Sequence, residues 1–303
     1  MRRIRPSHRA VLCTFLLLAL PGLAGFADEP AREDFAHPEY IVSAAELEER
    51  LGSPGLLIID TRNKMRYRMG HIPGAVHLSP SDLERSETLA NGETVTNLVM
   101  GPEQITPRLQ AAGINPESRI VIYDRGRHVL AARLWWMLDY YGHRHIAILD
   151  GGFEAWKALE GATDRAEPEP ERGSFVARPH PEKHADYEYV SANLGSKATA
   201  VCDALSAHSY AEGAIPGSVN LPQSGTIDPT SALLKSAEEL RAMLAQLDIG
   251  PEQEIVFYCG AGYAAAQDYF VARAIGVERV RLYDGSLKDW RARGGAVTPS
   301  GKS

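Results

Sequence analysis

The strongest constraint on the fold of this chain is that its sequence contains one pattern twice. The first half reads LLIIDTRNKMRYRMGHIPGAVHLSP and then RIVIYDRGRH; the second half reads ATAVCDALSAHSYAEGAIPGSVNLP and then EIVFYCGAGY. Asp60 precedes Gly74 by the same number of positions that separates Asp203 from Gly217. Repetition of several segments in the same order indicates a duplicated domain.

Each copy alternates short apolar runs with stretches of helical period. The runs are 56–60, 119–123 and 146–150 in the first copy, and 199–203, 254–258 and 280–284 in the second. Such runs are typical of strands that are buried on both faces. The helical stretches include 130–142, which ends at a glycine, and 236–250, which begins with a serine cap. The sequence therefore predicts an α/β fold of two tandem domains, each a parallel sheet flanked by helices.

The domain boundaries follow from composition. The copies are separated by GATDRAEPEPERGSFVARPHPEKH, a stretch rich in proline and charge that is typical of a linker. We place the N-terminal domain over 28–160, the linker over 161–185 and the C-terminal domain over 186–303.

The N-terminus has the pattern of a targeting segment. Four arginines precede the apolar run AVLCTFLLLALPGLAG, and small residues stand at Gly25 and Ala27. This pattern predicts a secretory signal peptide over 1–27 and a periplasmic or secreted mature protein. The alternative is an uncleaved anchor, but the apolar run is short for a membrane span. We expect no membrane span in the mature chain.

Charge and cysteine content restrict the function further. The formal net charge of −7 argues against nucleic acid as the main partner, because no basic field attracts phosphate. Removal of the signal peptide leaves two cysteines, Cys202 and Cys259, in a compartment that favours disulfides. Two cysteines are too few for a disulfide scaffold, so either they pair or at least one is a working thiol. We expect Cys202 to be a core residue.

Cys259 has the sequence context of a nucleophile. It directly follows an apolar strand, and Gly260 and Gly262 lie between it and a helix that we expect to begin near Ala264. Glycines allow successive N–H groups to turn inward, and with the helix N-terminus these groups form a nest that favours a thiolate. The alternative is a free thiol buried at a strand end. Asp124 holds the equivalent position in the first copy, which suggests one active and one supporting domain.

The same loop argues against phosphate chemistry. A cysteine phosphatase needs an arginine at the end of the loop to bind phosphate bidentately. That position is Ala265, and residues 260–266 contain no cation. Transfer of sulfur needs less positive charge, since a persulfide carries one negative charge.

Several motifs together resemble the rhodanese superfamily, and specifically its tandem-domain thiosulfate and 3-mercaptopyruvate sulfurtransferases. They are YRMGHIPGAVHL, WWMLDYYGH followed by ILDGG, YCGAGYAA and YDGSLKDW, and the resemblance spans about 41–290. It implies that Cys259 takes sulfur from a small donor as a persulfide and passes it to a thiol, cyanide or a protein thiol. It further implies that no metal or organic cofactor is needed and that backbone N–H groups stabilise the persulfide, in a loop of Gly260, Ala261, Gly262, Tyr263 and Ala264.

The chain departs from the family pattern at the donor site. No basic side chain follows Cys259, Ala261 replaces a serine, the serine's histidine partner is replaced near Asn97, and 204–214 contains no arginine. The donor therefore stays open between thiosulfate and 3-mercaptopyruvate. A second hypothesis is a non-catalytic binding or persulfide-carrier protein that kept the fold.

Three further residues are candidates for supporting roles. We expect Asp60 and Asp203, at strand ends, to accept hydrogen bonds from the loops that follow them. We expect His71 to support the turn before Pro73. Two other aspartates, Asp150 and Asp284, resemble turn-formers, and we expect the tryptophans to lie in the core or between the domains: Trp135, Trp136, Trp156 and Trp290.

Overall fold

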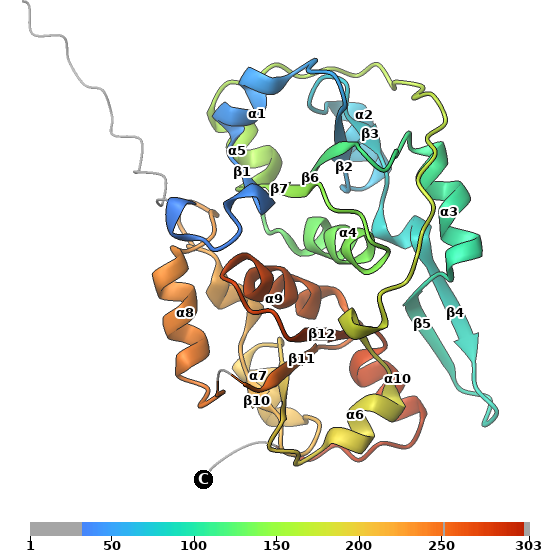
Figure 1. Ribbon diagram of the computed structural model, residues 1–303, viewed down its shortest axis with the longest axis vertical. Coiled ribbons are helices and arrows are strands. Elements are labelled where there is room, and N and C mark those ends of the chain that lie inside the picture. Colours follow the sequence, from blue (N-terminus) through green and yellow to red (C-terminus); the bar gives the residue numbers. More distant parts are fainter. Residues whose placement is uncertain (1–31, 251, 300–303) are drawn as a thin grey trace, which may run out of the picture.

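The computed structural model describes residues 32–250 and 252–299, so the predicted signal peptide lies outside the described residues. Helices and strands alternate in both halves of the chain (Figure 1). The first half contains β1 Ile41–Val42, α1 Ala44–Arg50, β2 Leu56–Asp60, α2 Lys64–Met69, β3 Val76–His77, β4 Glu84–Thr88, β5 Thr94–Val99, α3 Pro102–Ala111, β6 Arg119–Tyr123, α4 Val129–Tyr140, β7 Ile146–Leu149 and α5 Gly152–Ala158. The second contains β8 His184–Ala185, α6 Tyr187–Asn193, β9 Thr199–Asp203, α7 Ala207–Glu212, β10 Val219–Asn220, α8 Ala237–Ala245, β11 Glu254–Tyr258, α9 Tyr263–Ala274, β12 Val280–Tyr283 and α10 Ser286–Ala292.

The two main sheets have the same topology. Their strand orders are β1-β7-β6-β2-β3 and β8-β12-β11-β9-β10, and every pair within them is parallel. The apolar runs of the sequence supply the central strands, which are covered by helices on both faces, as expected for parallel sheets. The predicted α/β fold of two tandem domains is confirmed.

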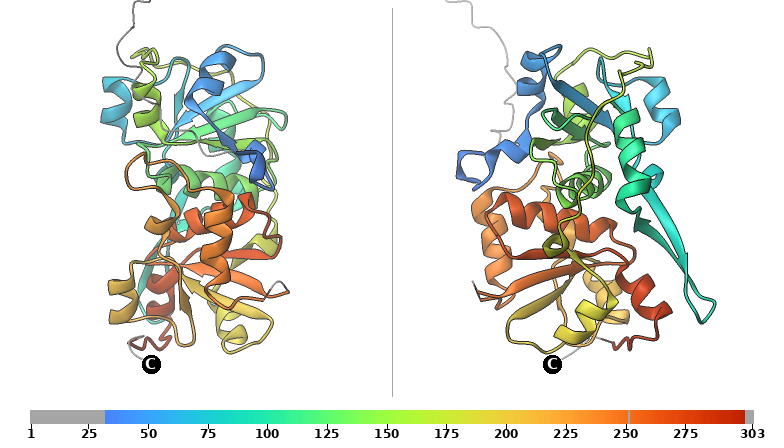
Figure 2. Two further views of the ribbon diagram at one scale, coloured as in Figure 1. Left: turned by 90° about the vertical axis from the view of Figure 1, so that its left-hand side faces the viewer. Right: turned by 45° about the vertical axis from the view of Figure 1, so that its right-hand side comes forward.

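Helices α4 and α9 form the centre of the contact between the domains, where Figures 1 and 2 show them packed together. The Trp135 ring meets the Phe270 ring edge-on at 5.1 Å between centroids. All four tryptophans are buried, so the expected core and interface positions are correct. Among the described residues, no helix is both long enough and apolar enough to cross a membrane.

The segment 161–185 is packed more closely than a free linker. Its last two residues form β8, which pairs with β12, so the second sheet begins inside this range. Earlier in the segment, Asp164 pairs with His71 through two backbone hydrogen bonds of 2.9 Å. Phe175 and Ala177 are buried in the core. These contacts could not be predicted from the sequence. The segment is rich in proline and charge, and its buried apolar residues are isolated, so they form no helical or strand periodicity.

A hairpin distinguishes the first domain from the second. Strands β4 and β5 form a separate antiparallel pair, and Figure 2 shows the hairpin extending along the second domain. Its Asn91 donates a side-chain hydrogen bond of 2.8 Å to the carbonyl of Ala292 at the end of α10. The hairpin therefore brings part of the first domain against α10 of the second.

Candidate active site

Cys259 lies directly after β11, at the carboxyl edge of the second sheet, and is 3% exposed. The helix behind the loop, α9, begins at Tyr263, one residue before the expected start. Gly262 precedes it with φ +81°, and a Cβ on this residue would lie 2.6 Å from the carbonyl oxygen of Asp284. Only glycine fits this position, since both the backbone angle and the space exclude a side chain.

Ser286 supports the loop from the first turn of α10. The N–H groups of Cys259 and Gly262 both donate to its hydroxyl oxygen, at 3.1 and 3.0 Å. The same oxygen lies 3.9 Å from the sulfur of Cys259 and 2.9 Å from the carbonyl of Tyr283. Ser286 is fully buried with φ +53°, a conformation uncommon outside glycine. Our sequence reasoning missed this residue, although the first copy has Gly152 in its place.

Further N–H groups of the loop are available to an anion. Tyr263, Ala264 and Ala265 form the first turn of α9, where backbone N–H groups have no partner within the helix. The N–H of Ala261 also has no hydrogen-bond partner among the described residues. With the positive end of the helix dipole, these donors can stabilise a persulfide at Cys259.

A buried ion-pair network from the first domain holds the other side of the loop. Arg133 of α4 is fully buried and contacts Asp284 at 2.6 Å and Glu84 at 3.2 Å. The hydroxyl of Tyr263 donates to Glu84 at 3.0 Å, and the side-chain amide of Asn97 donates to the same oxygen at 3.0 Å. Burial and the nearby Glu84 carboxylate raise the pKa of Tyr263, so its phenol stays a neutral donor.

Asp150 and Asp284 connect the domains rather than only forming turns. Asp284 accepts a hydrogen bond of 2.8 Å from the N–H of Val99 in the first domain. Asp150 accepts one of 3.0 Å from the N–H of Leu234 in the second. The two contacts are related by the pseudo-symmetry of the duplication, which sequence spacing alone did not indicate.

A hollow of 650 Å³ opens beside Gly260. It lies between the β4–β5 hairpin and α10, and its lining includes the cations Lys288, Arg291 and Arg293. Arg293 is engaged by Asp289 at 2.6 Å, whereas Lys288 and Arg291 are exposed. The Lys288 ammonium contacts the hydroxyl of Thr96 on β5. Helix α10 therefore brings two exposed cations to the hollow beside Gly260.

The first domain has the same loop with the anion already in place. The carboxylate of Asp124 accepts hydrogen bonds from the N–H groups of Gly126, His128 and Leu130, at 2.7, 3.1 and 3.1 Å. Asp124 thus fills the cradle with its own side chain. The loop 124–128 is one residue longer than the loop 259–262.

The other candidate residues contact their own domains. Asp60 accepts hydrogen bonds from the N–H and guanidinium of Arg62, and Asp203 accepts one from the N–H of Leu205, as expected for both. Burial raises the pKa of Asp203, which has no arginine in the position of Arg62. His71 is fully buried with its ring nitrogens 2.9 and 3.1 Å from the carbonyls of Tyr67 and Ala166, consistent with support of the turn.

Cys202 is a core residue of β9. It pairs in register with Phe257, is fully buried, and both described cysteines are free thiols. Burial, with a smaller contribution from Asp268, raises the pKa of Cys202 well above its usual value. Cys202 is therefore an inert thiol, and the disulfide with Cys259 is not formed.

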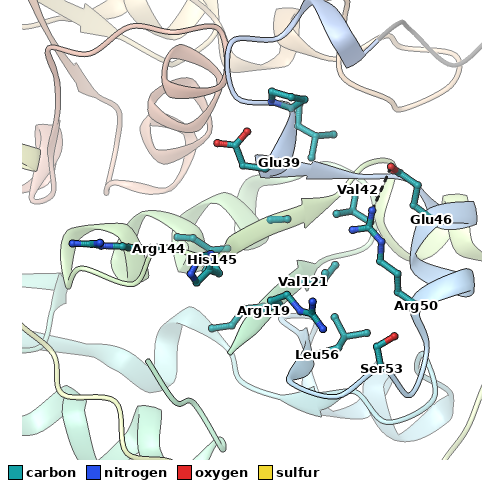
Figure 3. A pocket seen from close by; sticks show the side chains of 15 residues that line it. Glu39, Val42, Glu46, Arg50, Ser53, Leu56, Arg119, Val121, Arg144 and His145 are labelled. Carbon is teal, nitrogen blue, oxygen red and sulfur yellow. Dashed lines mark ion pairs between the residues drawn. The ribbon is translucent and has the colours of Figure 1, made fainter. Parts of the chain in front are cut away.

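Another hollow, of 550 Å³, lies at the opposite edge of the first sheet (Figure 3). It is formed at the amino ends of β1, β2, β6 and β7, and its charges include the Glu46–Arg50 pair at 3.8 Å. Because ligands of parallel sheets bind at the carboxyl edge, this hollow is not the catalytic site.

Comparison with known proteins agrees with this geometry. The profile of the rhodanese-like domain matches residues 43–159 and again 186–293. A thiosulfate sulfurtransferase of Pseudomonas aeruginosa is 32% identical over 264 residues, covering 84% of this chain and 95% of that protein. A probable 3-mercaptopyruvate sulfurtransferase of the same species is 30% identical, covering 82% of this chain and 94% of that protein.

A solved structure gives the same result. The crystal structure of a 3-mercaptopyruvate sulfotransferase from Escherichia coli superposes with a TM-score of 0.74 at 27% identity, covering 82% of this chain and 98% of that chain. Two matched domains and relatives of this similarity over most of the chain show the family. The chain belongs to the rhodanese family and is a tandem-domain sulfurtransferase.

Proposed function

We propose that this sulfurtransferase moves a sulfane sulfur from thiosulfate or 3-mercaptopyruvate to a thiol or cyanide acceptor through a persulfide on Cys259. The observation that carries the proposal is the asymmetry of the two loops. Asp124 blocks its own cradle, whereas Cys259 has a thiol at the same place with free N–H donors behind it.

The reaction requires two displacements at sulfur. The Cys259 thiolate attacks the terminal sulfur of thiosulfate or the thiol sulfur of 3-mercaptopyruvate. The S–S bond of thiosulfate, or the C–S bond of 3-mercaptopyruvate, then breaks, and its electron pair leaves on sulfite or on the enolate of pyruvate. The enolate then takes a proton. The persulfide anion is stabilised by the loop N–H groups, by the logic of an oxyanion hole. An acceptor thiolate or cyanide attacks the outer sulfur next, and the Cys259 thiolate leaves.

Lys288 and Arg291 are positioned to bind the charge of the donor. The N–H of Lys288 donates to the carbonyl of Gly260 at 3.1 Å, which fixes the start of α10 against the cysteine loop. Arg291 lies one turn further along α10, on the wall of the same hollow. A donor with its anionic group on these cations can place its sulfur toward the loop.

Intact-mass measurement tests the nucleophile. Incubation of the protein with either donor is expected to add one sulfur atom, which disappears when cyanide or dithiothreitol is added. Cys259→Ser is expected to abolish both the adduct and turnover, and Cys202→Ser is the matched control that retains them. Sulfur transfer by Cys259→Ser at the rate of the unaltered protein would refute the mechanism.

Donor kinetics test the cations. Lys288→Ala and Arg291→Ala are each expected to raise the KM for the donor about tenfold, as for loss of one charged hydrogen bond, and to change kcat less. Lys197→Ala is the control, since this exposed lysine precedes β9 at the opposite edge of the sheet. A KM unchanged in both α10 variants would remove these residues from the donor site.

We also propose that the protein is exported, on the basis of the arginines, apolar run and small residues of 1–27. Fractionation of producing cells followed by N-terminal sequencing is expected to give a periplasmic or secreted protein that begins at Asp28. Retention in the cytoplasm with residues 1–27 intact would contradict export.

A further inference from the structure

The first domain contains a hollow of 610 Å³ that the sulfur-transfer chemistry does not use. It lies at the carboxyl edge of the first sheet, beside the loop that holds Asp124. Its wall includes four arginines, Arg62, Arg66, Arg125 and Arg127. Four guanidinium groups around one hollow are unusual in a chain with a net charge of −7.

Two of these arginines have acidic partners and two do not. Arg62 binds Asp60 at 2.6 Å, and Arg125 binds Glu154 at 3.0 Å. Arg66 and Arg127 are exposed, and within 32–250 and 252–299 neither side chain has an ion pair or hydrogen bond. The Asp124 carboxylate also lines the hollow, but its oxygens accept three backbone N–H groups and have no ion pair with Arg66 or Arg127. With Asp60, Glu154 and Asp124 counted against the four arginines, a net positive charge of about one remains, and two guanidinium groups are unpaired.

The walls of the hollow are held rigidly. Arg62 packs over the Phe153 ring at 3.7 Å while its guanidinium is fixed by Asp60. Below the loop, His128 is fully buried with its Nε2 3.0 Å from Asp150. Although burial alone would lower it, the pKa of His128 is raised by the hydrogen bond to Asp150.

The second domain also reaches the rim of the hollow. Ala232 lines it, two residues before the Leu234 N–H that donates to Asp150. The site is thus formed where both domains meet.

The arginine side of the hollow is specific to the first copy. Arg62 and Arg66 lie between the strand end and the PG turn, in DTRNKMRYRMGHIPG, and the corresponding stretch of the second copy, DALSAHSYAEGAIPG, contains no arginine. Arg125 and Arg127 lie in the loop after Asp124. The corresponding loop after Cys259 contains Gly260, Ala261 and Gly262 and no arginine. The loops of the first copy therefore contain arginines at positions where the loops of the second copy do not, and the cations of the second copy lie on α10 and just after it.

We propose that this hollow is a second ligand site, which binds a small tetrahedral oxyanion of charge about −2 without turning it over. Guanidinium groups present paired N–H donors that match such oxyanions bidentately. Arg66 from α2 and Arg127 from the loop before α4 supply the unpaired guanidinium groups, and the Arg62–Asp60 and Arg125–Glu154 pairs form the wall around them. Among the described residues, the lining of the hollow contains no cysteine, so a bound anion keeps its sulfur or phosphorus unchanged.

Titration calorimetry on the whole protein tests the site, with sulfate, thiosulfate and inorganic phosphate as probes at constant ionic strength in chloride. Binding of the three probes is expected in the unaltered protein and in Cys259→Ser. The double variant Arg66→Ala/Arg127→Ala is expected to weaken it at least ~10-fold, since two charge-assisted hydrogen-bond donors are lost. Arg66→Lys/Arg127→Lys is expected to weaken it less.

Two controls separate this site from the catalytic one. Arg68→Ala removes an exposed arginine of the same helix that pairs with Glu167 outside the hollow, and is expected to leave binding unchanged. Lys288→Ala/Arg291→Ala is expected to leave unchanged the part of sulfate binding that depends on Arg66 and Arg127. The proposal is overturned if the unaltered protein binds none of the probes, if chloride competes at equal concentration, if Arg66→Ala/Arg127→Ala binds normally, or if only the α10 variant loses binding.

Discussion

The loops after β6 and β11 have equivalent positions in the two domains but contain different anions. In the first, Asp124 brings a permanent carboxylate that three backbone N–H groups bind. In the second, the Ser286 hydroxyl accepts hydrogen bonds from two N–H groups, and the remaining N–H groups of the loop are available to the persulfide sulfur on Cys259. Both loops direct backbone N–H groups toward an anion. In the first domain the anion is the side chain of Asp124, and in the second it is the persulfide that forms when a substrate supplies sulfur.

Emptying the first cradle gives the largest effect that we expect on stability. Asp124→Ala leaves two buried N–H groups and one partly buried N–H group without a partner, and is expected to lower the free energy of unfolding by about 2–3 kcal/mol. Urea unfolding measures the change. Asp228→Ala is the control, because Asp228 also accepts from two backbone N–H groups but is only partly buried, and its loss is expected to be smaller. Equal losses would contradict a special role for the cradle.

Altering the second loop toward the first is expected to reduce the rate. Ser286→Ala removes the acceptor of two N–H groups and is expected to lower kcat about tenfold. Ser286→Gly gives the residue found at Gly152 in the first copy, and it also relieves the φ of +53°. We therefore expect the glycine variant to be more stable than the alanine variant but equally slow. A glycine variant with full kcat would show that the hydroxyl is not needed.

The helices behind the loops differ as well. The sixth residue of α4 is the buried Leu134, whereas that of α9 is Asp268, which is 1% exposed. No described group bonds to either Asp268 carboxyl oxygen. Burial, followed by the charge of Asp203, raises the pKa of Asp268 well above its usual value.

This difference predicts a pH dependence. Above the unfolded pKa, the unfolded chain releases the Asp268 proton that the folded protein retains, so stability falls as pH rises toward the folded pKa. The loss per pH unit in this range is at most about 1.4 kcal/mol, the limit for one proton. Asp268→Asn lacks this proton, so its stability relative to the unaltered protein is expected to increase with pH in urea unfolding. Parallel pH curves for the two proteins would contradict the assignment.

Much of this arrangement could be predicted from the sequence. The duplication determined the fold, aligned Cys259 with Asp124 and located the loop within one residue of its observed helix. Ser286 was missed because it is 27 positions from Cys259 and meets it only when α10 packs on the loop. The difference between the copies is nevertheless visible in the sequence. The DGG motif at the start of α5 ends in Gly152, whereas the DGS motif at the start of α10 ends in Ser286.

Contacts between the domains could not be predicted in the same way. The β4–β5 hairpin occurs in one copy only, so the comparison of copies gave no information about where it packs. Lys288 and Arg291 lie on α10, outside the loop 260–266 in which the sequence shows no cation. They line the hollow because α10 packs beside that loop. These contacts depend on how two folded domains dock, which periodicity and turn signals do not encode.

The position of Arg133 has a consequence for how this protein can evolve. Its guanidinium belongs to the half of the chain without a thiol, yet it binds Asp284 at 2.6 Å and lies against Gly262 in the other half. A gene fragment that encodes only the C-terminal domain would expose this buried carboxylate and leave it without a counter-ion. The two halves are therefore expected to function only together, since substitutions at Arg133 in the half without the thiol would disturb the loop that holds the thiol in the other.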